Sequence, residues 1–148
     1  MTMKITINIV PERDDPEITV SCSRLTPEIE KIIASLRMLE NRLTVRADGA
    51  IHILDPFDAL YMESVERRTF VYTKGGVYET DLRLYELEEK LSDRYFLRVS
   101  KSCIVNLKKI KSLKTDLDRR IRITMDNGEQ IIASRTYADE LRKKLGVK

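Results

Sequence analysis

The sequence predicts an α+β protein built mostly from antiparallel strands. Short runs in which apolar and polar residues alternate recur along the 148 residues, and such alternation is typical of half-buried strands. Two of the links between these runs are Asp48-Gly49 and Asp126-Asn127-Gly128-Glu129, and Asp-Gly and Asn-Gly steps favour tight hairpins between antiparallel neighbours. Three other segments carry apolar residues at helical spacing, so helices are expected among the hairpins.

The first part of the chain, residues 1–54, predicts a small β-β-α-β-β extension. Its expected elements are strands at 4–9 and 18–22, a helix from Thr26-Pro27, and a hairpin of 43–47 with 50–54. The helix would begin with an N-cap followed by proline at the first helical position. Its apolar stripe consists of Ile29, Ile32, Ile33, Leu36 and Leu39. Because so small a unit does not bury this stripe unaided, we expect the extension to be a dimerisation element.

The remainder, residues 55–148, predicts a second, strand-rich unit. The expected strands are 60–64, 69–73, 77–80, 121–125 and 130–133, with one more hairpin inside 95–107. One helix is expected after Asp81, with its leucines on the buried face, and a last helix is expected to be capped by Ser134 or Thr136. Short polar side chains at these starts can accept hydrogen bonds from the free N–H groups of the first turn.

Charge is distributed unevenly along the chain. The net charge is only +3, yet residues 1–60 carry −3, and residues 98–148 carry +8 from 14 Lys or Arg and 6 Asp or Glu. Such asymmetry is typical of a part that faces a polyanion, and the alternative is a solvated lysine-rich surface. No apolar run is long enough to span a membrane, so the expected location is the cytoplasm. Cys22 and Cys103 lack the spacing of a disulfide framework or zinc site, and both are expected to be buried.

Four motifs stand in a recognisable order along the second unit. The first two are Asp58–Ser64 and Leu84–Leu91. The third consists of Phe96, Arg98, Ser102, Val105, Asn106 and the run Lys108-Lys109-Ile110. The fourth is Ile132–Tyr137. Together they resemble the LytTR family of bacterial DNA-binding domains over roughly residues 55–146, although Ser100 stands near the place of the usual His. The resemblance implies an elongated β fold whose loops enter successive major grooves, and hence a sequence-specific transcription regulator.

The resemblance also places the DNA-reading loops, at Glu66–Thr69, Ser100–Ser102 and Ser134–Thr136. The predicted DNA-binding residues are Arg67, Arg68, Arg98, Ser100, Lys101, Ser102, Lys108, Lys109, Ser134 and Arg135. Arg135 suits a bidentate contact to guanine. Arg98, Lys108 and Lys109 suit phosphate contacts, which position a protein on DNA without reading its sequence.

Several of these roles have a structural alternative. Arg98 would serve equally in an ion pair with a carboxylate such as Asp93, because exposed ion pairs are common. Lys108 and Lys109 would serve as an ordinary solvated run. Asn106 is expected to satisfy backbone groups in a turn.

The function has alternatives too, namely an RNA-binding or a protein-interaction module without catalysis. RNA recognition uses exposed aromatic side chains on which bases stack, and the candidates are Tyr61, Phe70, Tyr72 and Tyr78, whose strand patterns suit a core equally. An enzyme finds no support, since the sequence has no nucleophile–base pair, metal-ligand spacing or Gly-rich phosphate loop. No cofactor, metal or small-molecule substrate is therefore expected. The expected partners are double-stranded DNA, a second copy of the chain and, by resemblance to short family members without a receiver domain, a small integral-membrane antagonist.

Overall fold

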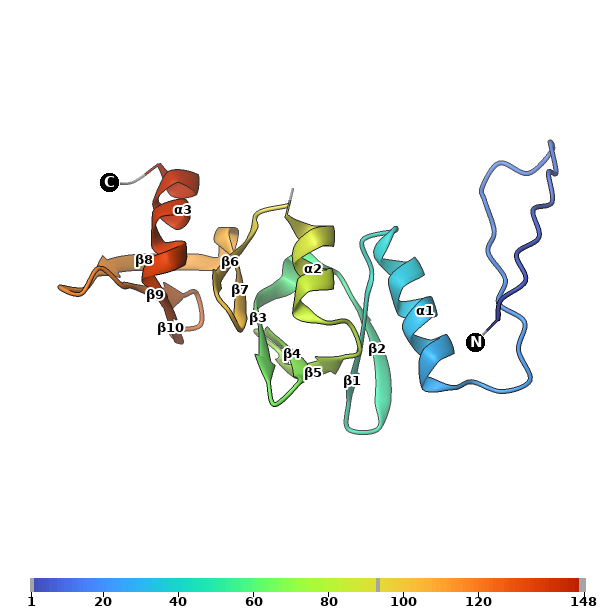
Figure 1. Cartoon of the computed structure of the whole chain (residues 1–148), viewed down its shortest axis with the longest axis horizontal. Coiled ribbons are helices and arrows are strands. Elements are labelled where there is room, and N and C mark those ends of the chain that lie inside the picture. Colours follow the sequence, from blue (N-terminus) through green and yellow to red (C-terminus); the bar gives the residue numbers. More distant parts are fainter. Residues whose placement is uncertain (1, 93, 147–148) are drawn as a thin grey trace.

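The computed structural model describes residues 2–92 and 94–146. The elements, in chain order, are α1 Pro27–Met38, β1 Leu43–Ala47, β2 Ala50–Leu54, η1 Pro56–Asp58, β3 Ala59–Val65, β4 Arg68–Thr73, β5 Gly76–Thr80, α2 Leu84–Leu91, β6 Phe96–Ser100, β7 Cys103–Asn106, η2 Leu107–Lys109, β8 Ile110–Thr115, β9 Ile121–Met125, β10 Gln130–Ala133 and α3 Arg135–Leu145. All strand pairs are antiparallel. The molecule is elongated, with the N-terminal segment at one end and α3 and β8–β10 at the other (Figure 1). The expected α+β, mostly antiparallel fold is confirmed.

Residues 2–26, all of which are described, form no helix or strand. The strands expected at 4–9 and 18–22 are therefore wrong for the single chain, although the helix and hairpin expected after them are present. Alternation tells which side chains would share a face, but a strand also needs a neighbour to satisfy its backbone N–H and C=O groups. No strand of the described residues pairs with the segment, which lies beyond α1 and away from both sheets (Figure 1).

Helix α1 begins where the sequence predicts. The Thr26 Oγ1 atom accepts a hydrogen bond from the Ile29 N–H at 3.3 Å, which satisfies one of the free donors of the first turn. The hairpin of β1 and β2 is also confirmed. Asp48 and Gly49 have φ angles of 53° and 75°, the left-handed values that a type I′ turn requires.

The seven-stranded sheet has the order β2-β1-β5-β4-β3-β7-β6, and the three-stranded sheet has the order β10-β9-β8. Strand β3 is an interior strand, since Met62 lies between Val71 of β4 and Ile104 of β7. Strand β8 was not expected from the sequence. It is an edge strand whose apolar residues are Ile110 and Leu113, and lysines occupy other positions, as is common on edges that must not pair with another chain.

Two apolar cores lie on opposite faces of β3. Met62 faces the first core, under α1 and α2, whose other large buried members include Leu43, Val45, Val71, Leu82, Leu87, Leu91 and Ile104. Tyr61 faces the second core, against the small sheet and α3, whose other large buried members include Leu97, Val99, Val105, Ile121, Ile123, Met125 and Leu141. Because one strand contributes to both cores, the two sheets and their helices form one packed body.

The packing runs across residue 54, where the sequence suggested that one unit ends and another begins. Strand β1 pairs with β5 through Arg46 and Glu79. Leu43 and Val45 belong to the same core as Met62 and Leu87. The hairpin of β1 and β2 is thus part of the large sheet, and a chain cut at residue 55 would lose part of its first core.

Three smaller expectations have clear outcomes. Cys103 is buried as expected, but Cys22 is exposed, because residues 18–22 do not form the half-buried strand in which Cys22 was expected to lie. Helix α2 begins after Arg83, and Asp81, expected as its cap, instead binds Arg46 at 2.5 Å. Among the described residues, none of the helices is both long and apolar enough to cross a bilayer.

Candidate nucleic-acid interface

Three turns lie together along one edge of the molecule. They are the β3–β4 turn at Glu66-Arg67, the β6–β7 turn at Lys101-Ser102 and the entry to α3 at Ser134. The Ser64 N–H donates to the Ser102 carbonyl oxygen at 2.8 Å, and the Ser134 N–H donates to the Val99 carbonyl oxygen at 2.9 Å. The β3–β4 and β6–β7 turns both point towards the lower side of Figure 1, where α3 also begins. We call this the reading edge.

The first turn of the reading edge presents Arg67. Glu66 and Arg67 have φ angles of 51° and 67°, so the turn is the tight, two-residue kind in which both central residues are left-handed. This is shorter than the loop Glu66–Thr69 expected from the sequence, and Arg68 is already the first residue of β4. Arg67 is exposed, and its guanidinium has no hydrogen bond or ion pair with any residue that the structure describes. Its carbonyl oxygen accepts a hydrogen bond from Arg83 Nη1 at 3.2 Å.

Arg68, by contrast, is engaged within the protein. Its guanidinium donates to both carboxylate oxygens of Glu79, at 3.1 and 2.7 Å, and lies 5.1 Å from the centre of the Phe70 ring. The hydrogen bond from Arg68 lowers the pKa of Glu79 below its ordinary value. Glu79 also lies 3.6 Å from Arg46. Arg68 must therefore leave Glu79 before both of its terminal nitrogens can contact DNA.

The second turn is held in place by Arg98, which lies behind it. Arg98 Nη1 donates to the Lys101 carbonyl oxygen at 2.6 Å, and Nη2 donates to Glu88 Oε1 of α2 at 3.1 Å. Only 14% of the Arg98 side chain is exposed. Arg98 thus has a carboxylate partner, but it is Glu88; Asp93 lies outside the described residues. This engagement favours a role in positioning the turn over direct contact with phosphate.

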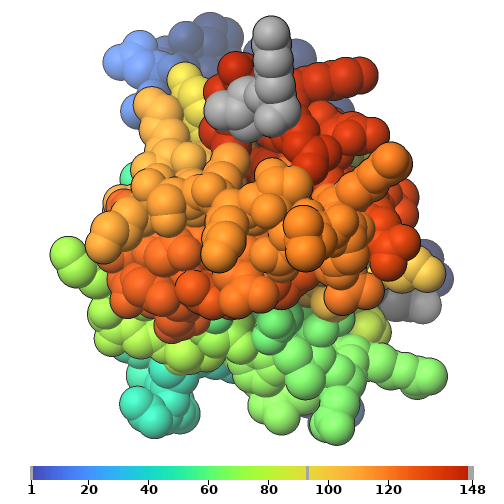
Figure 2. All heavy atoms as spheres, turned by 90° about the vertical axis from the view of Figure 1, so that its left-hand side faces the viewer, coloured from blue at the N-terminus to red at the C-terminus, as the bar shows by residue number. Residues whose placement is uncertain are grey.

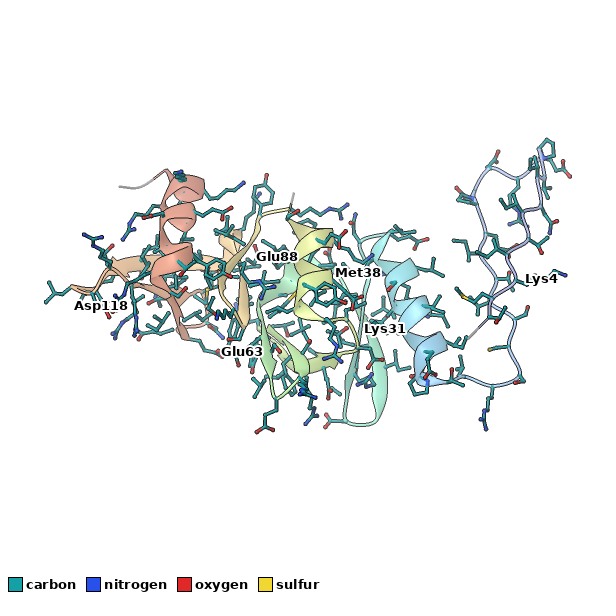
Figure 3. All side chains as sticks on the ribbon, viewed as in Figure 1. Lys4, Lys31, Met38, Glu63, Glu88 and Asp118 are labelled. Atoms are coloured by element: carbon teal, nitrogen blue, oxygen red, sulfur yellow. The ribbon has the colours of Figure 1, made fainter. Side chains whose placement is uncertain are left out.

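Both of these turns are braced by residues around α2. Arg83, the N-cap residue of α2, donates to the carbonyl oxygen of Arg67, and Glu88 anchors Arg98, which donates to the carbonyl oxygen of Lys101. Figure 3 shows Glu88 on the side of α2 that faces β6 and β7. Sequence reasoning did not identify Arg83, Glu88 or Glu79. Its only available signal was the charge of these residues, because their partners are distant in the sequence.

The remaining polar residues of the reading edge have smaller, local roles. Ser100 Oγ accepts a hydrogen bond from the Ser102 N–H at 3.3 Å, which stabilises the turn and leaves Lys101 exposed. Ser134 is the N-cap residue of α3, but its side chain makes no capping hydrogen bond. Arg135 follows it as an exposed residue, and across the described residues it has no ion-pair partner. Helix α3 therefore presents its N-terminus, where the helix dipole is positive, to the same edge.

Lys108 and Lys109 lie away from the reading edge, at the other end of β7. Asn106 forms the bend there as expected, since its side chain donates to the carbonyl oxygens of Phe57 and Ala59 at 3.0 and 2.9 Å. It also accepts from the Lys108 N–H at 3.0 Å. Lys108 Nζ lies 4.2 Å from the centre of the Tyr95 ring. The length of β7, roughly 10 Å, thus separates this pair from the β6–β7 turn.

Two of the four aromatic residues that an RNA-binding module would use are occupied. The Tyr61 and Tyr72 rings stack on each other with centroids 4.3 Å apart, Tyr61 is buried, and Tyr72 packs against the second core. Their hydroxyl groups donate to Glu129 and Glu63 respectively. Burial and these carboxylates raise the pKa of both tyrosines. Stacked and bonded in this way, the two rings offer no free platform for bases.

The reading edge borders the end of the molecule that is formed by the small sheet and α3. Figure 2 looks at the small sheet and α3 from the end of the molecule. The β3–β4 turn, in green, projects at the lower edge of this view, below the orange strand β8 and the red helix α3. Segments from distant parts of the sequence therefore meet at this end of the molecule.

Comparison with known proteins agrees with this fold. The profile of the LytTr DNA-binding domain matches residues 49–146. A solved LytTr DNA-binding domain from Bacillus cereus superposes with a TM-score of 0.68 and 28% identity, covering 72% of this chain and 97% of that one. Proteins named HTH-type transcriptional regulator in Staphylococcus aureus strains MSSA476 and N315 are each 26% identical over 147 residues, which is 98% of this chain and 99% of each relative.

The helix-turn-helix in those names has no counterpart in the part of this chain that the structure describes. Strands separate α1 from α2 and α2 from α3, so no two helices are joined by the short turn that the motif requires. The profile match spans well over half of the chain, and the sequence motifs, the fold and the cationic turns all agree with it. The chain belongs to the LytTR family of DNA-binding domains and is a DNA-binding transcription regulator.

Proposed function

We propose that this regulator reads duplex DNA by placing the three turns of its reading edge in the major groove. The observation that carries the proposal is that each turn presents one exposed cation without an ion-pair partner among the described residues: Arg67, Lys101 and Arg135. Backbone hydrogen bonds link the strands that hold these turns. A rigid edge of this kind can present several side chains to base edges at fixed spacing.

The three cations differ in what they can recognise. Arg67 and Arg135 each carry a planar guanidinium that can donate two hydrogen bonds to O6 and N7 of guanine. Lys101 offers a single charged group that suits a phosphate or one guanine acceptor. The hydroxyl groups of Ser100, Ser102 and Ser134 are suited to the adjoining phosphates.

The other predicted residues take supporting roles in this proposal. Lys108 and Lys109 contact phosphates on a flank of the site, since they lie beyond the end of β7. Arg68 joins the interface after exchanging Glu79 for a phosphate, because both anions accept two hydrogen bonds from a guanidinium. Arg98 positions Lys101 by donating a hydrogen bond to the Lys101 carbonyl oxygen.

The proposed setting is the bacterial cytoplasm, where the protein acts as a homodimer. Two copies would double the number of turns on one operator, which raises affinity without new kinds of contact. A small integral-membrane protein remains a proposed antagonist, by resemblance to short members of the family. The reading of DNA proposed here requires no cofactor or metal.

A selection from random duplexes, followed by gel shifts on the selected site, tests the proposal. The full chain should bind the selected duplex far more tightly than a scrambled duplex or a single-stranded RNA of the same length. Arg67→Gln should weaken binding to the selected site, and Lys144→Gln, at the far end of α3, is the matched control and should change little. Equal affinity for RNA and for both duplexes would refute reading by the turns.

A further inference from the structure

Two apolar surfaces at the N-terminal end remain open in the single chain. The first is a row on the extended segment: Ile5, Ile7 and Ile9 alternate, and they are 82%, 83% and 87% exposed. The second is the outer stripe of α1, which includes Leu39, itself 71% exposed. Neither belongs to the two cores. Contiguous apolar surface of this kind is a feature of interaction sites.

The α1 stripe forms the floor of two shallow hollows. One hollow, of about 600 Å³, lies between Leu36 and Leu39 and the chain's own Ile18 and Val20. The other, of about 490 Å³, is lined by Ile32, Leu36 and Leu39, with Lys31 and Lys90 among its polar neighbours. No residue of the segment 2–26 lines this second hollow. The chain therefore covers one side of its own helix and leaves the other open.

We infer that the open hollow receives residues 5–9 of a second copy, and that the second copy's hollow receives residues 5–9 of the first. The dimensions agree. An extended run from Ile5 to Ile9 spans about 13 Å at roughly 3.3 Å per residue, and the helical stripe from Ile32 to Leu39 spans about 10 Å at roughly 1.5 Å per residue. The chain's own Ile5–Ile9 run is directed elsewhere, since Lys4 lies far from Lys31 in Figure 3.

Charge supports the same occupant. The run is followed at once by an acidic turn that carries Glu12, Asp14, Asp15 and Glu17, with Arg13 as its one cation. Lys31 and Lys90 stand beside the open hollow and outnumber its one lining carboxylate, Glu28, although Lys31 is already 3.2 Å from Glu86. An incoming acidic turn meets these lysines, and a second copy supplies that turn in the same stretch of chain as the isoleucines.

Reciprocal exchange also explains why each chain has both an exposed isoleucine segment and an open hollow. Each copy offers one segment and one hollow, so the contact closes as a symmetric dimer and cannot extend further. The solved LytTr domain covers 72% of the chain, and the family profile starts at residue 49, so the exchanged segment and α1 lie outside the profile match. The inference deepens the homodimer of the proposed function and places its interface away from the reading edge.

Sedimentation of the full chain and two variants tests the interface without using DNA. Wild type should be dimeric at micromolar concentration. Ile5→Ser, Ile7→Ser and Ile9→Ser together should raise the dimer dissociation constant more than about 100-fold, because each isoleucine is fully removed from water in the dimer. The fold of each copy should survive, since these side chains are outside its cores. Ile51→Ser with Ile53→Ser, which removes isoleucines from the exposed part of β2, is the matched control and should remain dimeric.

Crosslinking decides between exchange and a segment that covers its own helix. In a Cys22→Ser background, Ile7→Cys and Leu39→Cys chains are purified separately, mixed and treated with a short bis-maleimide. Exchange predicts a covalent dimer from the mixture, and little from Ile7→Cys mixed with Ile51→Cys. A monomeric wild type, or a crosslink formed only within one chain that carries both cysteines, would overturn the inference. Gel shifts on the same variants report DNA reading separately, so the two proposals fail independently.

Discussion

Arg98 offers the sharpest test of how the reading edge works, because its two candidate roles predict different results. If Arg98 positions the β6–β7 turn, Arg98→Gln removes the donors to the Lys101 carbonyl oxygen and to Glu88, which lie at 2.6 and 3.1 Å. The turn then becomes mobile, while the number of cations that touch DNA stays the same. If Arg98 contacts a phosphate, the same change removes one such cation.

The expected size of the effect follows from these contacts. Hydrogen bonds that involve a charged group contribute about 1.5–3 kcal/mol when protected, but Glu88 is 44% exposed, and partly solvated ion pairs contribute about 1 kcal/mol or less. We expect a loss of about 2 kcal/mol in the free energy of unfolding. Reordering the equivalent of one backbone residue on binding costs about 1–2 kcal/mol, so affinity for DNA should fall roughly 5- to 30-fold.

The assay is a salt titration of DNA binding, together with urea unfolding of each variant. For Arg98→Gln the plot of log K against log salt should keep the wild-type slope, whereas the loss of one phosphate contact lowers it by about 0.9. Lys101→Gln shows the opposite combination if Lys101 binds phosphate, with a lower slope and unchanged stability. Arg142→Gln is the control, because it breaks a more exposed arginine–carboxylate pair, also at 3.1 Å, in α3. A lowered slope with unchanged stability in Arg98→Gln would refute the positioning role.

Two substitutions and one labelling experiment test other parts of the molecule. Arg135→Ala should lose about 1–3 kcal/mol of discrimination at one base pair, seen as a larger loss of affinity for the selected duplex than for a scrambled one; equal losses on both would make Arg135 a phosphate contact. Glu79→Gln frees Arg68, so binding should tighten and the salt slope should rise by about 0.9, and an unchanged slope would exclude Arg68 from the interface. The pKa of Glu79 is lowered by Arg68, so its stabilising contribution is present at neutral pH and lost as the pH falls through that lowered value; urea unfolding of Glu79→Gln should lack this part of the acid dependence. Burial raises the pKa of Cys103 to about 12, so a thiol reagent at pH 8 should label Cys22 rapidly and Cys103 only after unfolding, and rapid labelling of both would contradict the burial.

The β1–β2 turn and the bend at Asn106 were predictable from the sequence because their chemistry is local. Asp48-Gly49 has the positive φ angles that its residue types favour, and Asn106 satisfies the backbone around it in the way its side chain allows. The partners of the arginines were not predictable in this way. Glu88 and Glu79 meet Arg98 and Arg68 only because α2 and β5 pack beside the β6–β7 and β3–β4 turns. The sequence does not distinguish these two glutamates from its many other carboxylates.

Alternation of apolar and polar residues predicted a strand that does not form at residues 4–9, and it did not predict strand β8. Residues 4–9 alternate as regularly as any strand in the protein, yet they form none, because periodicity reports a face and does not supply the neighbour that completes the hydrogen bonds. Strand β8 forms although only Ile110 and Leu113 face the core. Pairing with β9 decides its structure, and a tertiary contact of this kind overrides a weak local pattern.

The reading edge is assembled from distant parts of the sequence, and this has a consequence for synthesis. Its three turns lie near residues 66, 101 and 134, and they meet only after β7 has paired with β3 and the Ser134 N–H has bonded to Val99. Long-range pairings of this kind form late in folding. A nascent chain that has not yet exposed residues beyond 135 therefore has no complete reading edge, and under the proposed function it would not yet read its operator.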